Sequence, residues 1–195
     1  MLNLILCGPP GSGKGTQAAK LVEKYKLIHI STGDLFRREK KSNSLIWQEV
    51  QNHINKGELA PDSITFKLLK AEMDNTPDAV GFIFDGFPRN VNQAELLDKF
   101  LKEEENTSVS ILLELQVPDK VIIDRILERG KTSGRVDDQK ESIVQNRIDI
   151  YQSETAPVAS YYEQFGKTKR LNGVGTMDEV FGRLSDELDA IRSLS

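Results

Sequence analysis

The sequence has a single cysteine, Cys7, and no long apolar run. One cysteine excludes an intramolecular disulfide and a cysteine-rich zinc site, and the apolar residues around it indicate that it is a small buried hydrophobe. No stretch of about 18 apolar residues is present, as a membrane-spanning helix would require. The first apolar stretch is too short for a signal peptide and lacks basic flanks. We therefore expect a soluble, cytoplasmic protein.

The chain also has fewer positively charged residues than negatively charged ones. The chain has 26 Lys and Arg residues against 30 Asp and Glu residues, so its formal net charge is −4. General nucleic-acid binding needs a basic face, which an acidic chain does not favour. Any anion site must therefore come from a local concentration of arginine and lysine. The length of 195 residues predicts one compact domain with room for small mobile insertions.

A glycine-rich turn follows the first apolar stretch. The run Leu2–Cys7 predicts a short buried strand, Gly8, Gly11, Gly13 and Lys14 come next, and a helical pattern follows. Strand, glycine turn and helix is the context in which G-x-x-x-x-G-K indicates a phosphate-binding loop. Glycines let backbone N–H groups close round a phosphate chain, and the helix N-terminus and the lysine add positive charge.

The turn departs from the general phosphate-loop pattern at one position. The general pattern has Ser or Thr directly after the lysine, whereas this chain has Gly15 there and a hydroxyl one residue later, at Thr16. A direct bond from this hydroxyl to magnesium is therefore less secure than in the general motif. The narrower pattern G-x-P-G-x-G-K-G-T points to a subset of phosphate-loop proteins.

Apolar stretches and helical patterns alternate along the rest of the chain. Further strands are predicted at 28–30, 81–84, 109–115 and 168–171, and helices at 14–25, 32–60, from 61–62 onward, at 90–101, 118–128 and 140–165 and at the C-terminus. We expect the helix 140–165 to bend near Pro157, and the last helix to bury Met177, Val180, Phe181, Leu184, Leu188 and Ile191. Long crossovers predict a parallel sheet covered on both faces, a three-layer αβα fold of the α/β class.

Charged side chains follow the predicted strands at the edge where ligands bind in such folds. Asp85 ends the strand 81–84, where it is well placed to hold a magnesium ion beside the phosphate loop. Six arginines are candidates for this anion site: Arg37, Arg89, Arg125, Arg129, Arg135 and Arg147. Arg125 and Arg129 share a helix face, and Arg135 is in the polar loop 130–139. Arg147 lies near the apolar stripe of the helix 140–165, where its charge needs a partner or an anion. A reaction between two polyphosphates needs such a cluster and no obligatory base, so His29 and His53 need no role.

Several motifs together resemble the adenylate kinase family, in its form with a short lid. They are GPPGSGKGTQ at 8–17, HISTGDLFR at 29–37, GELAPD at 57–62, FDGFPRNVNQA at 84–94, ERGKTSGRVDD at 128–138 and NRIDIY with TAPVASYY within 146–162. The resemblance implies the reaction ATP + AMP ⇌ 2 ADP with magnesium, on a core with a five-stranded parallel sheet of the P-loop NTPase type. It implies a core (1–30, 61–129, 140–195), an AMP-binding insertion (31–60) and a lid (130–139).

The resemblance also assigns residues by matching motif. It implies an ATP site at Gly11, Ser12, Gly13, Lys14, Gly15, Thr16, Arg125, Arg129 and Gly175. It implies an AMP site at Thr32, Arg37, Glu58, Leu59, Ala60, Gly86, Phe87, Pro88, Arg89, Gln93, Arg135 and Arg147, with a cis peptide at Phe87–Pro88. Catalysis would rest on Lys14, Arg89, Arg129, Arg135 and Arg147, with magnesium near Asp85 and Thr16 through water.

Two residues bear on the choice of the phosphate acceptor. The amide of Gln93 offers one donor and one acceptor side by side, which complements adenine. Relatives that act on UMP and CMP typically have asparagine there and alanine in place of Thr32, so both positions favour AMP. A UMP/CMP kinase is the alternative with the same fold.

Other classes of phosphate-loop protein fit less well. A GTP-binding switch would need N-K-x-D, and the nearest match, NKGE at 55–58, lacks the aspartate. The lid 130–139 contains no Cys or His, so we predict no structural zinc there. The family resemblance and the lack of a leftover apolar helix face favour a monomer.

Overall fold

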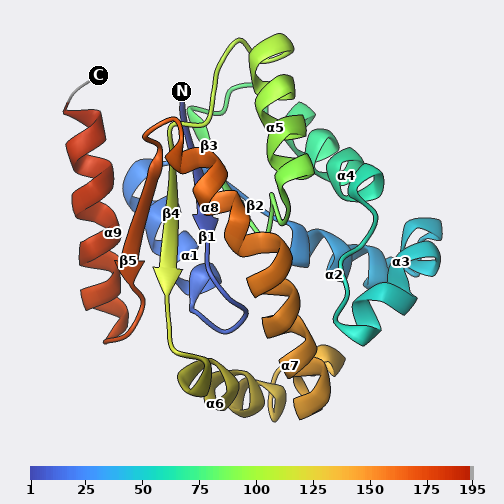
Figure 1. Cartoon of the computed structure of the whole chain (residues 1–195). Helices are drawn as coiled ribbons and strands as arrows, with labels where there is room; N and C mark the ends of the chain where they lie inside the picture. Colours follow the sequence, from blue (N-terminus) through green and yellow to red (C-terminus); the bar gives the residue numbers. More distant parts are fainter. Residues whose placement is uncertain (194–195) are drawn as a thin grey trace.

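Within residues 1–193, which the computed structural model describes, five parallel strands form one sheet (Figure 1). They are β1 (Leu2–Cys7), β2 (Ile28–Ser31), β3 (Gly81–Asp85), β4 (Ile111–Gln116) and β5 (Thr168–Asn172), in the order β2-β3-β1-β4-β5. The three central strands are almost entirely buried, because helices cover both faces of the sheet. This confirms the predicted three-layer αβα fold with a five-stranded parallel sheet.

Helices connect the strands and extend beyond their carboxyl ends. They are α1 (Lys14–Tyr25), α2 (Thr32–Ser42), α3 (Leu45–Lys56), α4 (Asp62–Asp74), α5 (Val91–Glu103), α6 (Asp119–Gly130), α7 (Glu141–Ile150), α8 (Ala156–Glu163) and α9 (Met177–Arg192). A short 3-10 turn covers Val136–Asp138, and a π-helical turn covers Tyr151–Thr155.

The two faces of the sheet carry separate apolar cores. Helices α1 and α9 cover one face, where Leu21 and Leu184 pack with Leu4 of β1. Helices α4, α5 and α8 cover the other face, where Cys7 is 4% exposed. Successive residues of β1 thus enter opposite cores, as the alternation of side chains along a strand requires. The prediction that Cys7 is a buried hydrophobe is confirmed.

Two smaller apolar clusters lie outside these cores. Trp47, Val50 and Ala60 are buried among α2, α3 and the start of α4. Val117, Ile122, Ile126, Val144 and Ile148 are buried between α6 and α7. Figure 1 shows α6 and α7 beyond the tip of β4, and α2 and α3 to the side of the sheet. The main cores are therefore flanked by two small units near the carboxyl ends of the strands.

Three sequence predictions need correction. The segment 32–60 forms two helices, because Asn43 adopts a left-handed conformation (φ 48°) and Ser44 caps a new helix. The segment 140–165 is interrupted by the π-helical turn at Tyr151–Thr155, before Pro157, which fits the first turn of α8.

The side chain of Met177 is the third correction. It is 60% exposed, although its spacing from Val180 predicted burial. Met177 is the first residue of α9, and this turn meets α1 through its backbone: Gln17 Nε2 donates to the Met177 carbonyl oxygen over 3.0 Å. The buried stripe of α9 begins one turn later.

Candidate active site

Two cavities open at the carboxyl ends of the strands, and each has a volume of about 540 Å³. The first is lined by the glycine-rich turn after β1, by Asp85 at the end of β3 and by the π-helical turn. The second is lined by α2, α3 and the segment 57–60. Four arginines line both cavities: Arg37, Arg89, Arg135 and Arg147. The two spaces therefore meet at a cluster of positive charge.

The phosphate loop keeps its shape because its glycines adopt conformations that other residues avoid. Gly11 has φ 79°, and a Cβ there would lie 2.7 Å from Ile126 Cγ1. Gly13 has φ 96°, and a Cβ there would meet no atom within 4 Å. The loop leads directly into α1, whose first-turn N–H groups have no partner within the helix. An anion placed in the open space beside Gly13 could accept hydrogen bonds from these N–H groups.

Lys14 turns its ammonium group toward the loop. Its Nζ donates to the carbonyl oxygens of Gly8 over 2.7 Å and of Pro9 over 2.9 Å. Burial lowers the pKa of Lys14 to about 8, although the charge of Asp85 opposes this shift. A phosphate chain in the first cavity would place negative charge beside this group and favour its protonated form.

Asp85 is held beside the loop by a residue to which the sequence assigned no role. His29 Nε2, on the neighbouring strand β2, lies 3.3 Å from Asp85 Oδ2. Burial raises the pKa of Asp85, but the hydrogen bond with His29 and the charge of Lys14 outweigh it and hold the pKa below its ordinary value. Ser31 pairs with Asp85 in the parallel sheet, and this register places His29, two residues earlier on β2, close to Asp85.

The turn after Asp85 joins two of the predicted residues. The Gly86 carbonyl oxygen accepts from Thr32 Oγ1 over 2.8 Å and from Arg89 Nε over 2.7 Å. Gly86 has φ 76°, and a Cβ there would lie 2.7 Å from Thr32 Oγ1. The peptide bond Phe87–Pro88 is cis, as expected. The turn thus fixes the Arg89 guanidinium at the wall between the cavities.

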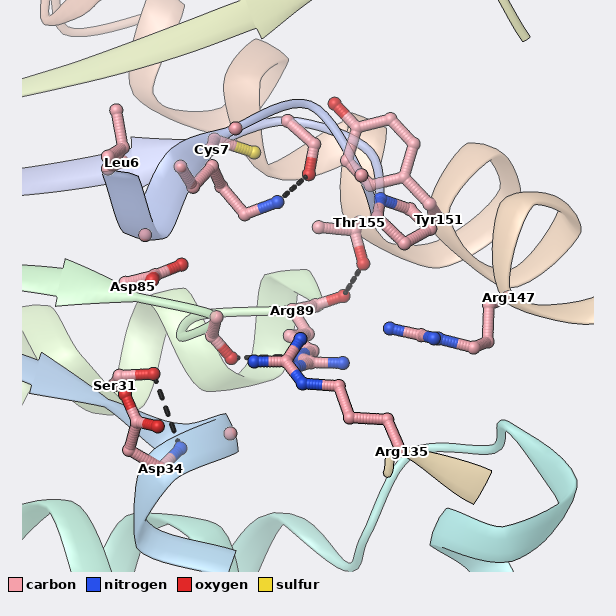
Figure 2. Close-up of a pocket in the computed structure, with 18 of the residues that line it drawn as sticks. Leu6, Cys7, Ser31, Asp34, Asp85, Arg89, Arg135, Arg147, Tyr151 and Thr155 are labelled. Carbon is pink, nitrogen blue, oxygen red and sulfur yellow. Dashed lines mark hydrogen bonds between the residues drawn. The ribbon is translucent and has the colours of Figure 1, made fainter. Parts of the chain in front are cut away.

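Figure 2 shows Arg89, Arg135 and Arg147 pointing toward the same space. Arg89 and Arg135 have no carboxylate within ion-pair distance among the residues that the structure describes. Burial lowers the pKa of Arg89, and the charge of Arg147 lowers it further. Burial also lowers the pKa of Arg135, together with the charges of Arg129 and Arg37. Crowded guanidinium groups of this kind favour an anion between them.

The other arginines of the cluster have acidic partners. Arg147 Nη1 lies 2.8 Å from Asp137 Oδ2 and 2.7 Å from Asp138 Oδ1. Arg129 Nε donates to Asp138 Oδ2 over 2.7 Å. Arg37 pairs with Asp34, three residues earlier on α2. The sequence predicted that the charge of Arg147 would need a partner or an anion, and the structure provides two carboxylates.

Most of the predicted site residues line these cavities, and a few do not. Thr32, Glu58, Leu59, Ala60 and Gln93 line the second cavity. Four predicted residues line neither cavity: Arg125, Gly175, and the buried residues Ser12 and Phe87, which are 2% and 1% exposed. The structure therefore gathers the predicted AMP site more completely than the predicted ATP site.

Gln93 lies at the wall of the second cavity with its amide already hydrogen-bonded. The side chain is 1% exposed; its Oε1 accepts from the backbone N–H of Arg89 over 2.7 Å, and its Nε2 donates to Asp62 Oδ1 over 2.6 Å. Sequence reasoning missed Asp62, which lies 31 residues before its partner. Only its place in GELAPD, next to the predicted segment 58–60, could have indicated it.

Trp47 lines the second cavity and is 7% exposed, with Lys40 Nζ 5.3 Å from its ring centroid.

No helix between residues 1 and 193 is long and apolar enough to span a membrane. Over the same residues, no three His, Cys, Asp or Glu side chains form a group that could hold a metal ion. A metal at Asp85 would therefore need further ligands from its substrate or from water, which is the usual arrangement for magnesium.

Comparison with known proteins gives a consistent result. A sequence model described as adenylate kinase matches residues 6–167. An adenylate kinase of Flavobacterium psychrophilum is 45% identical over 97% of this chain and 99% of its own length. Adenylate kinases of Parabacteroides distasonis and Bacteroides thetaiotaomicron are 44% and 42% identical, each over 98% of this chain and 100% of their own length.

Proposed function

Because the chain belongs to the adenylate kinase family, we propose that its two cavities hold ATP and AMP and that a phosphoryl group passes between them. The chain is a nucleoside monophosphate kinase, a phosphotransferase of nucleotide biosynthesis, and its reaction is ATP + AMP ⇌ 2 ADP. One observation carries the proposal: two cavities of similar volume share the same four arginines. The phosphate groups of ATP and AMP could approach one another there without a prohibitive repulsion between their charges.

We assign the first cavity to ATP. The phosphate loop 11–16 would hold the ATP phosphates through backbone N–H groups and through Lys14, which would leave the carbonyl oxygens of Gly8 and Pro9. Arg129 lines this cavity and would clamp the phosphates from the far side. Arg125 and Gly175, taken from the family motif, would take part only after a rearrangement, since neither lines the cavity.

We assign the second cavity to AMP. Thr32, Leu59 and Gln93 would surround the nucleoside, and Arg37, Arg89 and Arg147 would bind its phosphate. Glu58, Ala60, Gly86, Phe87 and Pro88 would complete the pocket through backbone or packing. This arrangement points the AMP phosphate at the shared arginines and therefore at the end of the ATP phosphate chain.

The residues present fit a magnesium ion bound with ATP. Asp85 supplies a hard carboxylate oxygen, and an ideal Cβ on Gly15 would lie 4.0 Å from its Oδ2, so the carboxylate reaches the phosphate loop. Asp85 and Thr16 would hold the ion through water. When bound, such an ion supplies charge neutralisation across the phosphate oxygens.

The chain's own residues would act by position and charge. Arg89, Arg135 and Arg147 would stabilise the charge that spreads over the oxygens of the transferring group, and no general base is needed. The segment 130–139 would close as a lid and exclude water, which would otherwise accept the phosphoryl group. We propose this lid, the AMP-binding insertion 31–60 and the remaining core as the units of the domain, with no structural zinc in the lid.

We propose that Thr32 and Gln93, which both line the second cavity, select AMP as the acceptor. A coupled assay of ADP formation with ATP and AMP, UMP, CMP or GMP tests this. AMP should be used fastest; faster turnover with UMP or CMP would overturn the assignment. We further propose a cytoplasmic monomer whose partners are ATP, AMP and ADP, with no nucleic acid or membrane partner.

A further inference from the structure

We propose that Asp62 is a positioning residue that fixes which way round the Gln93 amide lies, and so makes the second cavity select adenine. The inference rests on the proposed AMP site and adds to it a residue that contacts no part of the nucleotide. Asp62 is the first residue of α4, and Gln93 belongs to the first turn of α5. The two helices meet at their N-terminal ends, beside the second cavity.

The amide of Gln93 lies between one obligatory donor and one obligatory acceptor. The backbone N–H of Arg89 lies 2.7 Å from Oε1, and Asp62 Oδ1 lies 2.6 Å from Nε2. A backbone N–H can only donate, and an ionised carboxylate can only accept. The reversed amide would place its NH₂ against the Arg89 N–H and its oxygen against the Asp62 carboxylate. Both contacts would be repulsive at these distances, so a single orientation is permitted.

Asn90 holds Asp62 in place. Its Nδ2 donates to Asp62 Oδ1 over 3.1 Å and to Oδ2 over 3.3 Å. Its Oδ1 caps α5 by accepting from the backbone N–H of Gln93 over 2.8 Å. Asn90 therefore holds both oxygens of the carboxylate, and the Gln93 side chain that this carboxylate contacts is 1% exposed.

This arrangement has a consequence for base recognition. An amide oxygen can accept twice and an amide NH₂ can donate twice, so one acceptor and one donor of Gln93 remain. Adenine presents an acceptor at N1 and a donor at its 6-amino group. Hypoxanthine, the base of inosine monophosphate (IMP), presents the reverse, a donor at N1 and an acceptor at O6. A glutamine that could turn over would fit either base, whereas one held by Asp62 fits adenine and opposes hypoxanthine.

The test compares kcat/KM for AMP and for IMP at saturating ATP. In Asp62→Ala one of the two groups that oppose the reversed amide is gone, and only the backbone N–H of Arg89 still disfavours it. The ratio of AMP to IMP should therefore fall by about tenfold, through a higher KM for AMP and a lower one for IMP. Asp62→Asn should retain most of the ratio, because its amide oxygen can still accept from Gln93 and Asn90. The KM for ATP should not change in either variant.

Asp119→Ala is the matched control. Asp119 is likewise the first residue of a helix after a proline, and it likewise accepts from a glutamine, Gln152 Nε2, over 3.2 Å. It is exposed and lines neither cavity. Asp119→Ala should therefore leave the ratio of AMP to IMP unchanged. Asp62→Ser, too short to reach Gln93, replaces Asp62→Ala if that variant does not fold.

The possible outcomes separate the inference from the function on which it rests. If Gln93→Ala abolishes the preference for AMP over IMP but Asp62→Ala lowers both activities equally, the role of Asp62 is overturned and the AMP site stands. An equal change of the ratio in Asp119→Ala would likewise overturn it. The change would then follow from the loss of any carboxylate at a helix start, and not from the loss of the contact with Gln93. If Gln93→Ala leaves the ratio unchanged, the proposed AMP site fails and the inference fails with it.

Discussion

Arg147 donates a hydrogen bond from Nη1 to Oδ1 of Asp138 over 2.7 Å, so the segment proposed as a lid is tied to the arginine cluster. The Asp138 side chain is completely buried and also accepts from Arg129. Phosphate groups in the first cavity would compete with this carboxylate for the same guanidinium groups. The charge of Asp138 therefore bears on both the stability of the domain and the binding of substrate.

Replacement of Asp138 by Asn should destabilise the protein. Removing the buried charge of Asp138 leaves Arg129 and Arg147 without this partner. Because both arginines are partly exposed, we expect a loss of about 1–3 kcal/mol in the free energy of unfolding. Urea unfolding measures it. Asp178→Asn is the control: it removes an exposed ion pair with Lys20 and should cost less than about 1 kcal/mol. Equal losses in the two variants would contradict the importance of the buried pair.

The contribution of Asp138 should also depend on pH. Burial raises the pKa of Asp138, but hydrogen bonds and charges from Arg129 and Arg147 outweigh it and hold the pKa below its ordinary value. A carboxylate with a lowered folded-state pKa stabilises above its unfolded value of about 3.9 and loses this contribution as the pH falls through the folded value. The difference in stability between wild type and Asp138→Asn should therefore be constant near neutrality and shrink below about pH 4.

ATP binding should take up protons at alkaline pH because of Lys14. Its folded-state pKa of about 8 lies below the ordinary value, so the ligand-free protein loses this charge as the pH rises above about 8. Phosphate would restore the proton, and the affinity for ATP should fall with rising pH over this range. Calorimetry at pH 8.5 in buffers of different ionisation enthalpy measures the uptake. Lys14→Met should abolish the proton uptake. Uptake of the same size in that variant would show that another group binds the proton.

The same lowered pKa predicts a trend in stability without ligand. A lysine whose folded-state pKa is depressed binds its proton more weakly in the folded state than in the unfolded state. Between about pH 8 and the unfolded value of about 10.4 the unfolded state therefore holds more protons, and the Lys14 contribution to stability rises with pH. Urea unfolding across this range should therefore show the stability of wild type rising relative to that of Lys14→Met.

Gly13→Ala should fold but bind ATP poorly. No atom lies within 4 Å of the added Cβ, so the folded state bears mainly the strain of φ 96°, about 1–2 kcal/mol. The methyl group would project into the space proposed for phosphate. Gly166→Ala is the matched control, since Gly166 has φ 67°, open space around a Cβ and no place at either cavity. It should lose similar stability and keep its affinity for ATP; a parallel loss of affinity would refute the role of Gly13.

Trp47 should report AMP binding by fluorescence. It is the only tryptophan of the chain, it is 7% exposed, and it lines the second cavity but not the first. Titration with AMP should change its emission with a midpoint that matches the KM for AMP, whereas ATP alone should have a much smaller effect. An equal response to both nucleotides would argue against the separate assignment of the cavities.

The sequence predicted best what is local in the chain. The glycine-rich turn after β1, the helix start at Thr32 and the end of β3 at Asp85 each depend on a few neighbouring residues, and the sequence predicts all three at their observed positions. The length and alternation of the elements were enough to predict the three-layer fold. The arginines at strand ends could be grouped because parallel strands end at one edge of the sheet.

Contacts between distant residues were beyond such reasoning. Asp62 and Gln93 belong to different helices, and nothing in the local pattern of either gives the distance between them. Asp138 lies in a polar loop, where burial of a carboxylate is unexpected without knowledge of Arg129 and Arg147. Met177 fits the apolar stripe of α9, yet its burial depends on what lies opposite the first turn.

The central claim is that phosphoryl transfer occurs at the arginines shared by the two cavities, from ATP to AMP. A single-turnover experiment with excess enzyme, magnesium and ATP labelled on its γ-phosphate tests it most directly. We predict that the label appears in ADP only when AMP is present, with little release as inorganic phosphate, and that Arg89→Met slows this transfer by about 100-fold or more. Label released mainly as inorganic phosphate, or transferred unchanged in Arg89→Met, would contradict the claim.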